Sequence, residues 1–411
     1  MSGSKVKNFL RKYMMLIVTV GVVFLFYFIT GGQSLLPQNI NNLISQNAYV
    51  FVLGTGMLLC ILTGGNIDLS VGSVVCLAGG VGAIIMDANL PWPIAVIAML
   101  VMGVLVGAWH GFWIAYVKVP PFIATLVGML AFRGLANLIM KGFAYQVTDK
   151  TFLNIFGGGD TCYIPDFLAG IGPDMGLNKT CLFAGILIAA GYTVFTLVNR
   201  VNLVKKGYKV DSLITLVIKT GLIDAVVVWI AYKLAQYKGI PTVLIWIALV
   251  LGTFAYITSK TTLGRNLYAV GGNEKATRLS GINTKMVMFS AYTLMGLLAG
   301  FAGVLNIARL MGSQPTYGLG YEMDAIAACF IGGASAYGGT GSVGGVIIGA
   351  ALCGIINQGM ILAHTPPNYQ TVVKGLVLLV AVLFDVIMQM RRKGSKKKKK
   401  IETTEKGGAT A

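Results

Sequence analysis

The chain has 411 residues, of which 56% are hydrophobic and only 11% are charged, and its mean hydropathy is +0.77. Soluble domains carry roughly a quarter charged residues, so this composition excludes a soluble protein and indicates an integral membrane protein. The net charge of +18 therefore reflects membrane topology, and we expect no nucleic-acid partner because no soluble domain is available to bind one.

Apolar runs of about twenty residues, the length that crosses a bilayer core, recur along the whole chain. We expect an all-α polytopic fold of ten to twelve transmembrane or re-entrant helices, with a transmembrane domain at 13–390. The first span has too long an apolar core for a cleaved signal peptide. The predicted spans are 13–30, 43–62, 70–86, 93–116, 122–140, 180–198, 211–234, 241–257, 286–308, 323–341, 344–363 and 368–390.

Two stretches within these spans, 64–73 and 331–345, are rich in glycine and serine. Such sequences favour broken or re-entrant helices, and irregular backbone persists at membrane depth only where protein or a watery cavity satisfies its polar groups. The glycines of the second stretch are interpreted first as close helix packing, ahead of a pore lining.

Basic residues concentrate in four segments, 1–12, 199–210, 258–285 and 391–411, which hold 22 of the 32 lysines and arginines. Cytoplasmic segments carry such an excess, so we expect these four segments, including a basic arm at 1–12 and a disordered basic tail at 391–411, in the cytoplasm. The tail is expected to attract anionic lipid. The loop 141–179 has more acids than bases and is expected outside.

Motifs for catalysis are absent from the sequence. It contains no nucleophile elbow, no H-E-x-x-H helix and no G-x-x-x-x-G-K-[ST] loop to hold ATP. His110 and His364 stand in separate regions, so no metal site is predicted. We therefore expect a protein that is not an enzyme and carries no cofactor of its own, with any ATP hydrolysed by another chain. We interpret Cys162 and Cys181 as free thiols rather than as a disulfide, because their spacing alone does not bring them within bonding range.

Polar residues inside the apolar runs are the candidate translocation residues. Asn66, Asp68 and Ser70 lie at the mouth of a span, and Asp324 precedes a small-residue helix in a loosely similar stretch of the second half. An acidic residue at this depth in the membrane is a candidate functional residue. Asp68 or Ser70 can also cap the helix that begins near Leu69. The two readings are compatible.

Other polar residues are given structural interpretations. We expect Trp109, His110 and Trp113 to form an aromatic belt rather than a ligand cage, and Arg133 to pair internally or to reach the membrane surface. Lys219 and Asp224 share one span and are expected to serve as packing partners or to meet a neighbouring subunit. The alternative function is a proton-coupled secondary transporter that uses Asp68, Asp224 or Asp324 as its proton carrier.

The basic segment 258–285 contains one short helix in the sequence GGNEKATRLSG. Asn273 is a good N-cap, Glu274 falls in the first turn and Arg278 in the last, where the helix dipole favours each charge. Glu274 and Arg278 are four residues apart, so they share a face of the helix and can pair, although an exposed pair contributes only about 0.3 to 0.5 kcal/mol. Gly281 is expected to end the helix with a positive φ.

Four ordered motifs carry a resemblance to a known family: GNIDLSVGS at 65–73, KVPPFIATLVGMLAFRGL at 118–135, TTLGRNLYAVGGNEKATRLSGI at 261–282 and YEMDAIAACFIGGASAYGGTGSVGG at 321–345. With them the chain resembles the bacterial ATP-binding-cassette sugar permeases of the ribose, xylose and multiple-monosaccharide group. The run from Gln46 to Ser73 and YIPDFL at 163–168 are most similar to xylose and multiple-sugar permeases. Residues 203–240 depart from the family pattern.

The resemblance implies a permease subunit in the bacterial cytoplasmic membrane. Two permease copies would form the path as a homodimer, two ATPase subunits that hold ATP would dock underneath, and an extracytoplasmic sugar-binding protein would deliver the sugar. The segment 258–285 would be the coupling loop, whose helix contacts the ATPase through Asn273, Glu274, Ala276, Arg278 and Gly281.

Overall fold

The computed structural model describes residues 17–170, 176–208, 210, 212–383 and 386. The predicted basic arm at 1–12 and the tail at 391–411 lie outside the described residues. The elements in chain order are η1 (Gln33–Leu35), α2 (Pro37–Gln46), α3 (Ala48–Leu62), α4 (Val71–Asp87), α5 (Trp92–Phe112), the π-helix η2 (Trp113–Val117), α6 (Pro121–Met140), β1 (Tyr145–Gln146), α7 (Lys150–Phe156), α8 (Lys179–Lys205), α9 (Leu213–Ala235), α10 (Thr242–Lys260), α11 (Thr262–Gly272), α12 (Glu274–Leu279), α13 (Thr284–Leu310), β2 (Gly312–Ser313), α14 (Tyr321–Ile331) and α15 (Val343–Leu362).

Long apolar helices dominate the described residues. Eight helices are long and apolar enough to cross a membrane: α2 with α3, α5 with η2, α6, α8, α9, α10, α13 and α15. Three shorter apolar helices accompany them, Ile17–Ile29, α4 and Pro367–Leu383. The prediction of an all-α, multi-pass membrane protein is therefore confirmed.

The helices depart from the predicted spans at the irregular stretches. The span expected at 43–62 starts earlier, at Pro37, and is divided at Asn47 between α2 and α3. The span expected at 323–341 is shorter than predicted, because α14 ends at Ile331 and residues 332–342 are not helical. Residues 63–70 are also not helical. The prediction that both glycine-rich stretches interrupt helices is confirmed, and we call these two segments the broken loops.

The centre of the bundle is formed by α3, α4, α13 and α14, whose side chains are mostly buried. Helices α5 and α13 cross with their backbones in contact: a Cβ added at Gly103 would clash with Gly296, and one added at Gly107 would clash with Tyr292. Small residues four apart permit this close approach between membrane helices. The bundle is therefore held by tight backbone packing.

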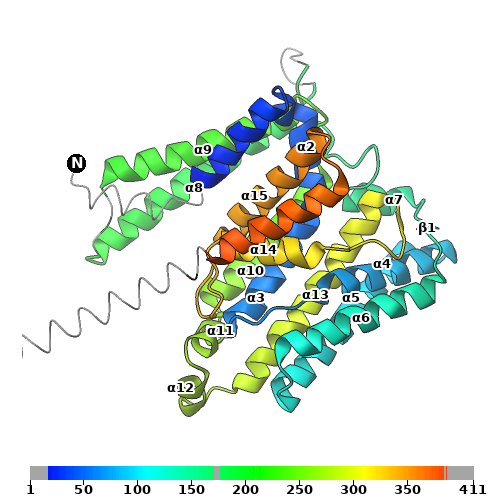
Figure 1. Cartoon of the computed structure of the whole chain (residues 1–411). Helices are drawn as coiled ribbons and strands as arrows, with labels where there is room; N and C mark the ends of the chain where they lie inside the picture. Colours follow the sequence, from blue (N-terminus) through cyan, green and yellow to red (C-terminus); the bar gives the residue numbers. More distant parts are fainter. Residues whose placement is uncertain (1–16, 171–175, 209, 211, 384–385, 387–411) are drawn as a thin grey trace, which may run out of the picture.

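Helices α8 and α9 form a hairpin along one side of the bundle, beside α2 (Figure 1). A small buried cluster of Ile40, Cys181, Leu234 and Ala235 joins the hairpin to α2. Most other side chains of the two helices are exposed, as expected where a helix faces lipid.

The bundle has two ends with different structures (Figure 1). At one end β1 pairs antiparallel with β2, in the register Tyr145 with Ser313 and Gln146 with Gly312. This pairing ties the chain after α6 to the end of α13, next to α7. At the opposite end lie α11 and α12. We call these the β-ribbon end and the α12 end.

Candidate functional site

Helices α11 and α12 are each started by a side-chain cap. The Thr261 hydroxyl accepts from the backbone N–H of Gly264, and Asn273 Oδ1 accepts from Ala276 N at 3.0 Å. Past the end of α12, Gly281 has φ +83°. The sequence therefore predicted this helix, its Asn273 cap and its Gly281 terminus correctly.

The predicted partner of Glu274 was wrong. Glu274 Oε1 lies 3.4 Å from Lys118 Nζ and accepts from the Thr284 hydroxyl at 3.3 Å, and no ion pair with Arg278 forms in the described chain. Lys118 follows the π-helix η2 and has φ +70°, a left-handed conformation that a non-glycine residue seldom adopts. Glu274 thus links α12 to the connection between α5 and α6. Sequence reasoning did not identify Lys118.

The exposed residues of α12 and its N-cap are Asn273, Lys275, Ala276, Arg278 and Leu279. Leu279 is 88% exposed, which is unusual for a leucine on a helix that has an apolar bundle beside it. A basic side chain and an exposed leucine on adjacent residues make this surface suitable for binding another protein. Leu279 was not among the predicted residues.

The inner side of α11 packs against the end of α3 and against the second broken loop. A Cβ added at Gly271 would clash with the Leu62 carbonyl oxygen and with the backbone nitrogen of Gly339. Tyr268 donates its hydroxyl to the Gly341 carbonyl at 2.8 Å. The second loop also contacts the end of α3, where Gly339 N donates to Leu62 O at 3.1 Å, and the first loop, where a Cβ added at Gly65 would clash with the Ala336 carbonyl oxygen. Helix α11 is therefore in backbone contact with the end of α3 and with the second broken loop, which in turn touches the first loop, and we call this contact region the loop junction.

The first broken loop holds three of the predicted path residues. Asp68 is 3% exposed, and its Oδ1 accepts from the backbone N–H of Ser70 at 2.8 Å and from the Ser70 hydroxyl at 2.6 Å. Asn66 donates to the Thr63 hydroxyl at 3.0 Å. Ser70 occupies the N-cap of α4 without making a side-chain cap bond. Of the two capping residues proposed, Asp68 is the one that accepts a backbone N–H, although α4 begins at Val71 rather than near Leu69.

Helix α6, which carries another of the family motifs, closes over this loop. The Thr125 hydroxyl lies 3.4 Å from the Ile67 carbonyl, and the Ser73 hydroxyl donates to the Met129 carbonyl at 2.8 Å. Lys118 contacts Glu274, α11 contacts the second broken loop, and the two loops contact each other. The structure therefore brings together the four sequence motifs at 65–73, 118–135, 261–282 and 321–345.

Asp324 belongs to a separate cluster. It is 3% exposed, accepts from the Tyr49 hydroxyl at 2.6 Å and pairs with Lys374 Nζ at 2.8 Å. The Tyr49 ring stacks on Tyr321 with 3.7 Å between centroids. Within the described chain, no hydrogen bond joins Asp324 to Asn66, Asp68 or Ser70. The cluster fastens helix Pro367–Leu383 to α14.

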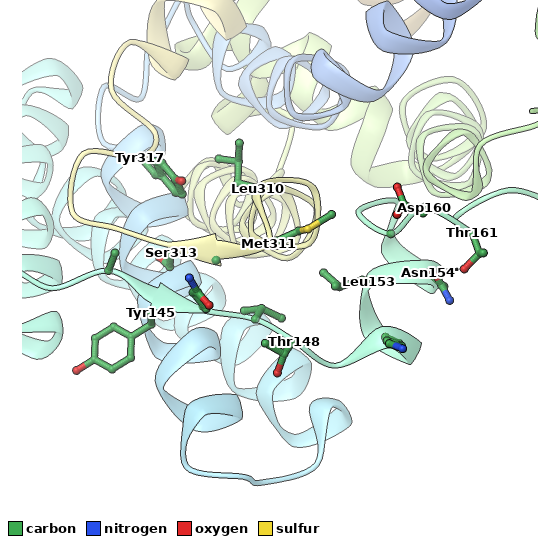
Figure 2. A pocket seen from close by; sticks show the side chains of 16 residues that line it. Tyr145, Thr148, Leu153, Asn154, Asp160, Thr161, Leu310, Met311, Ser313 and Tyr317 are labelled. Carbon is green, nitrogen blue, oxygen red and sulfur yellow. Dashed lines mark hydrogen bonds between the residues drawn. The ribbon is translucent and has the colours of Figure 1, made fainter. Parts of the chain in front are cut away.

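A cavity of about 770 Å³ opens at the β-ribbon end. Figure 2 shows side chains around it from β1, α7, the end of α13 and β2. Its lining mixes hydroxyl, amide and carboxylate groups with a few apolar side chains, and Asn154 and Thr161 share a hydrogen bond of 2.8 Å at its edge. Such a lining can hydrogen-bond a polyhydroxylated ligand. The polar lining residues include Tyr145, Gln146, Thr148, Asn154, Asp160, Thr161, Ser313 and Tyr317.

Asp166 anchors the loop beside this end to the start of α8. Its carboxylate accepts from the Thr180 hydroxyl at 2.7 Å and from the backbone N–H groups of Leu168, Lys179 and Thr180. Desolvation alone would raise the pKa of Asp166, but these hydrogen bonds, led by that of Thr180, lower the pKa to about 2. The anchor therefore stays ionised at neutral pH.

The remaining predicted residues have structural surroundings. Trp109 and Trp113 are partly exposed, while His110 is fully buried against Trp109 and Phe132. Arg133 donates to the Pro315 and Tyr317 carbonyls, as the internal-pairing interpretation expected. Asp224 accepts from the Thr193 hydroxyl and does not pair with Lys219. All six cysteines are free and buried, so Cys162 and Cys181 are not bridged.

Comparisons with known proteins agree with the motifs. The family described as the branched-chain amino acid transport system / permease component matches residues 39–382. The xylose transport system permease protein of Escherichia coli (strain K12) is 35% identical over 95% of each chain. The corresponding xylose protein of Haemophilus influenzae is 36% identical over 92% of this chain and 96% of its own.

The ribose import permease protein of Escherichia coli (strain K12) is 35% identical over 85% of each chain. No solved structure matches the chain. Similarity at this level along nearly the full length shows the family, and it confirms the resemblance that the motifs carry. The chain therefore belongs to the family of branched-chain-type transport permease components, among which it is related to the permeases of xylose and ribose transport systems.

Proposed function

We propose that this chain is the transmembrane subunit of an ATP-driven monosaccharide importer. The names of its relatives assign them to xylose and ribose transport, and the observation that carries the proposal is the loop junction. An exposed helix, α12, follows α11, whose glycine backbone rests on the end of α3 and on the second broken loop. A partner that moves α12 would therefore move the membrane-embedded backbone.

In this proposal the α12 end is cytoplasmic, both termini lie inside, and the chain makes ten to twelve passes or re-entrant segments in the bacterial cytoplasmic membrane. Segment 258–285 is the coupling loop, with Asn273, Glu274, Ala276, Arg278 and Gly281 shaping the helix that an ATPase subunit contacts. Leu279, 88% exposed, adds an apolar contact to the same surface.

The β-ribbon end is then external, together with loop 141–179. The cavity there receives the sugar from an extracytoplasmic binding protein, and two permease copies form the path. Asn66, Asp68 and Ser70 lie in a broken loop at the junction and are the foremost path candidates. Asp324 is a weaker candidate, because Tyr49 and Lys374 already occupy its carboxylate. Nothing in the contacts of Asp68, Asp224 or Asp324 favours the alternative proton carrier.

Copurification from native membranes tests the proposal. A tagged chain should bring down a Walker-type ATPase, and vesicles that contain the complex should take up xylose or ribose in a vanadate-sensitive manner. The matched control is the same chain reconstituted alone, which should not move sugar. Sugar transport by the lone chain, or uptake that collapses with an uncoupler and survives loss of the ATPase, would overturn the proposal.

A further inference from the structure

The α8–α9 hairpin carries two cations that face the membrane at the α12 end. The Thr193 hydroxyl donates to Asp224, and a Cβ added at Gly185 would clash with the side chain of Ala231. Both contacts fix the register of the antiparallel pair. With the helical rise of about 1.5 Å per residue, this register puts Arg200 of α8 opposite residues 216–217 of α9, within one helical turn of Lys219.

These two cations have no anionic partner in the described chain. No ion pair involves Arg200 or Lys219 among the described residues. The neighbouring Asp224 accepts from Thr193 through Oδ2, and its Oδ1 is buried without a partner. Nη1 of Arg200 is buried and makes no hydrogen bond. A buried donor without an acceptor is unfavourable, and more so for a charged group. An anion from another molecule would neutralise the exposed charge of Lys219 and that of the partly exposed Arg200.

The surroundings of the pair are apolar and open. The residues that bury the hairpin, Cys181, Leu234 and Ala235 with Ile40 of α2, lie at its opposite end. Near the cations, the apolar side chains of both helices are exposed. They include Phe195, Val198, Val201 and Val204 on α8 and Leu213, Ile214, Val217 and Ile218 on α9. In a membrane protein, such faces contact acyl chains.

The depth of the cations suits a lipid headgroup. Lys219 is roughly 9 Å along the axis from the start of α9, and Arg200 about 8 Å from the end of α8. Lysine and arginine at that distance from a helix end extend their charged tips to the membrane surface. Lys205 and Lys206, both exposed, add positive charge at the same end.

We propose that Arg200 and Lys219 bind the phosphate of an anionic phospholipid, whose acyl chains lie along the exposed faces of α8 and α9. A phosphate offers oxygens to the exposed Lys219 ammonium and to the partly exposed Arg200 side chain together. A second copy of this chain is a poorer occupant, because it would present the same two cations to each other in a protein of net charge +18. The site does not depend on transport.

The test uses the full chain purified in detergent, with lipid retention measured by native mass spectrometry. We expect phosphatidylglycerol to be retained in preference to phosphatidylcholine of the same acyl chains. Arg200→Gln with Lys219→Gln should reduce this preference about tenfold, the effect of losing one or two charge-assisted hydrogen bonds. The matched control is Lys238→Gln, an exposed lysine at the other end of the hairpin, which should keep the preference.

A conservative substitution distinguishes the loss of the charge from a folding defect. Lys219→Arg should retain the phosphatidylglycerol preference while Lys219→Gln weakens it. Equal retention of both lipids by the wild-type chain, or an unchanged preference in the double variant, would overturn the inference. So would cross-linking of α9 to α9 of a second copy that competes with phosphatidylglycerol. None of these measurements needs the ATPase or the sugar, so they stand apart from the test of transport.

Discussion

At the scale of single residues, Asp68 is a buried acid stabilised by its own local backbone. One carboxylate oxygen accepts from both the N–H and the hydroxyl of Ser70, and the side chain is 3% exposed. Two hydrogen bonds from a residue two positions ahead hold the loop in the shape that leads into α4. The same residue therefore supports local structure and places a carboxylate inside the membrane-spanning body.

The two roles of Asp68 can be separated by substitution. Asp68→Asn keeps a carbonyl oxygen for the Ser70 N–H, so the chain should insert and assemble while sugar uptake falls with the lost charge. Asp68→Leu removes the acceptor as well, at about 0.5 to 2 kcal/mol for a capping-type bond, so both assembly and uptake should fall. Membrane levels and vesicle uptake measure the two effects. Near-normal uptake by both variants would contradict any role for Asp68.

The residue scale also shows where prediction from sequence stops. The Asn273 cap and the positive φ of Gly281 were predictable, because both depend on neighbours within a few residues. Glu274 pairs with Lys118, which is 156 residues away in the chain, rather than with Arg278 on its own helix. Sequence spacing reveals only partners on the same element, so a partner brought in by the fold could not be found.

At the scale of elements, α12 is a short helix most of whose side chains are exposed. Its Thr277 side chain is buried and bonds to the Ala269 carbonyl of α11 at 2.8 Å. Its Glu274 reaches Lys118 through an exposed pair, which contributes only about 0.2 to 1 kcal/mol. The helix is thus attached firmly to α11 and weakly to the rest of the protein, which suits an element that another protein moves.

Substitutions in and after α12 should uncouple the protein without unfolding it. Gly281→Val puts a branched side chain at φ +83°, where no neighbour lies within 4 Å of the new Cβ, so its effect is local backbone strain of about 1 to 3 kcal/mol. Arg278→Glu reverses an exposed charge. Both variants should insert normally, bind or stimulate the ATPase less, and import less sugar.

The matched controls for α12 are Gly281→Asn and Arg278→Lys. Asparagine tolerates the left-handed conformation, and lysine keeps the charge, so both should couple normally. If Gly281→Val and Arg278→Glu hold the ATPase and import sugar at the wild-type rate, then α12 is not the coupling element.

At the scale of the whole molecule, the loop junction connects regions that are far apart in the sequence. Residues of α3, α11 and the second broken loop meet backbone to backbone around Leu62, Gly271 and Gly339. Contacts through main chain leave little room for side-chain rearrangement, so a displacement at one member is passed on to the others.

Adjacent glycines in α11 provide a sharp test of the junction. Gly271→Ala would place a Cβ against two backbone atoms, whereas a Cβ at Gly272 meets nothing within 4 Å. We expect Gly271→Ala to cost about 1 to 3 kcal/mol through overpacking and to reduce uptake, while Gly272→Ala stays within about 0.5 kcal/mol of wild type. Thermal unfolding in detergent measures the change in stability, and vesicle uptake measures the change in transport. If Gly271→Ala and Gly272→Ala have the same stability and the same uptake, the loop junction does not transmit a displacement of α11.

The global fold was predictable to the extent that hydropathy determines it. A membrane span must satisfy its backbone internally and be long enough for the bilayer, so most helices lie where the apolar runs are. The division at Asn47 and the early end of α14 depend on which surfaces pack against which, and composition does not contain that information. The same holds for the convergence of the four motifs, which were recognisable individually while their contacts were not.

The burial of all six native thiols has a practical consequence. A membrane-impermeant maleimide finds no reactive cysteine on the folded surface, because Cys60, Cys76, Cys162, Cys181, Cys329 and Cys353 are covered. The unaltered chain therefore serves as the negative control for chemical labelling. A single cysteine introduced at exposed Thr161 or Ser280 would report the sidedness of the β-ribbon end or of the α12 end in sealed vesicles, without the packing defects that removal of the native cysteines would create.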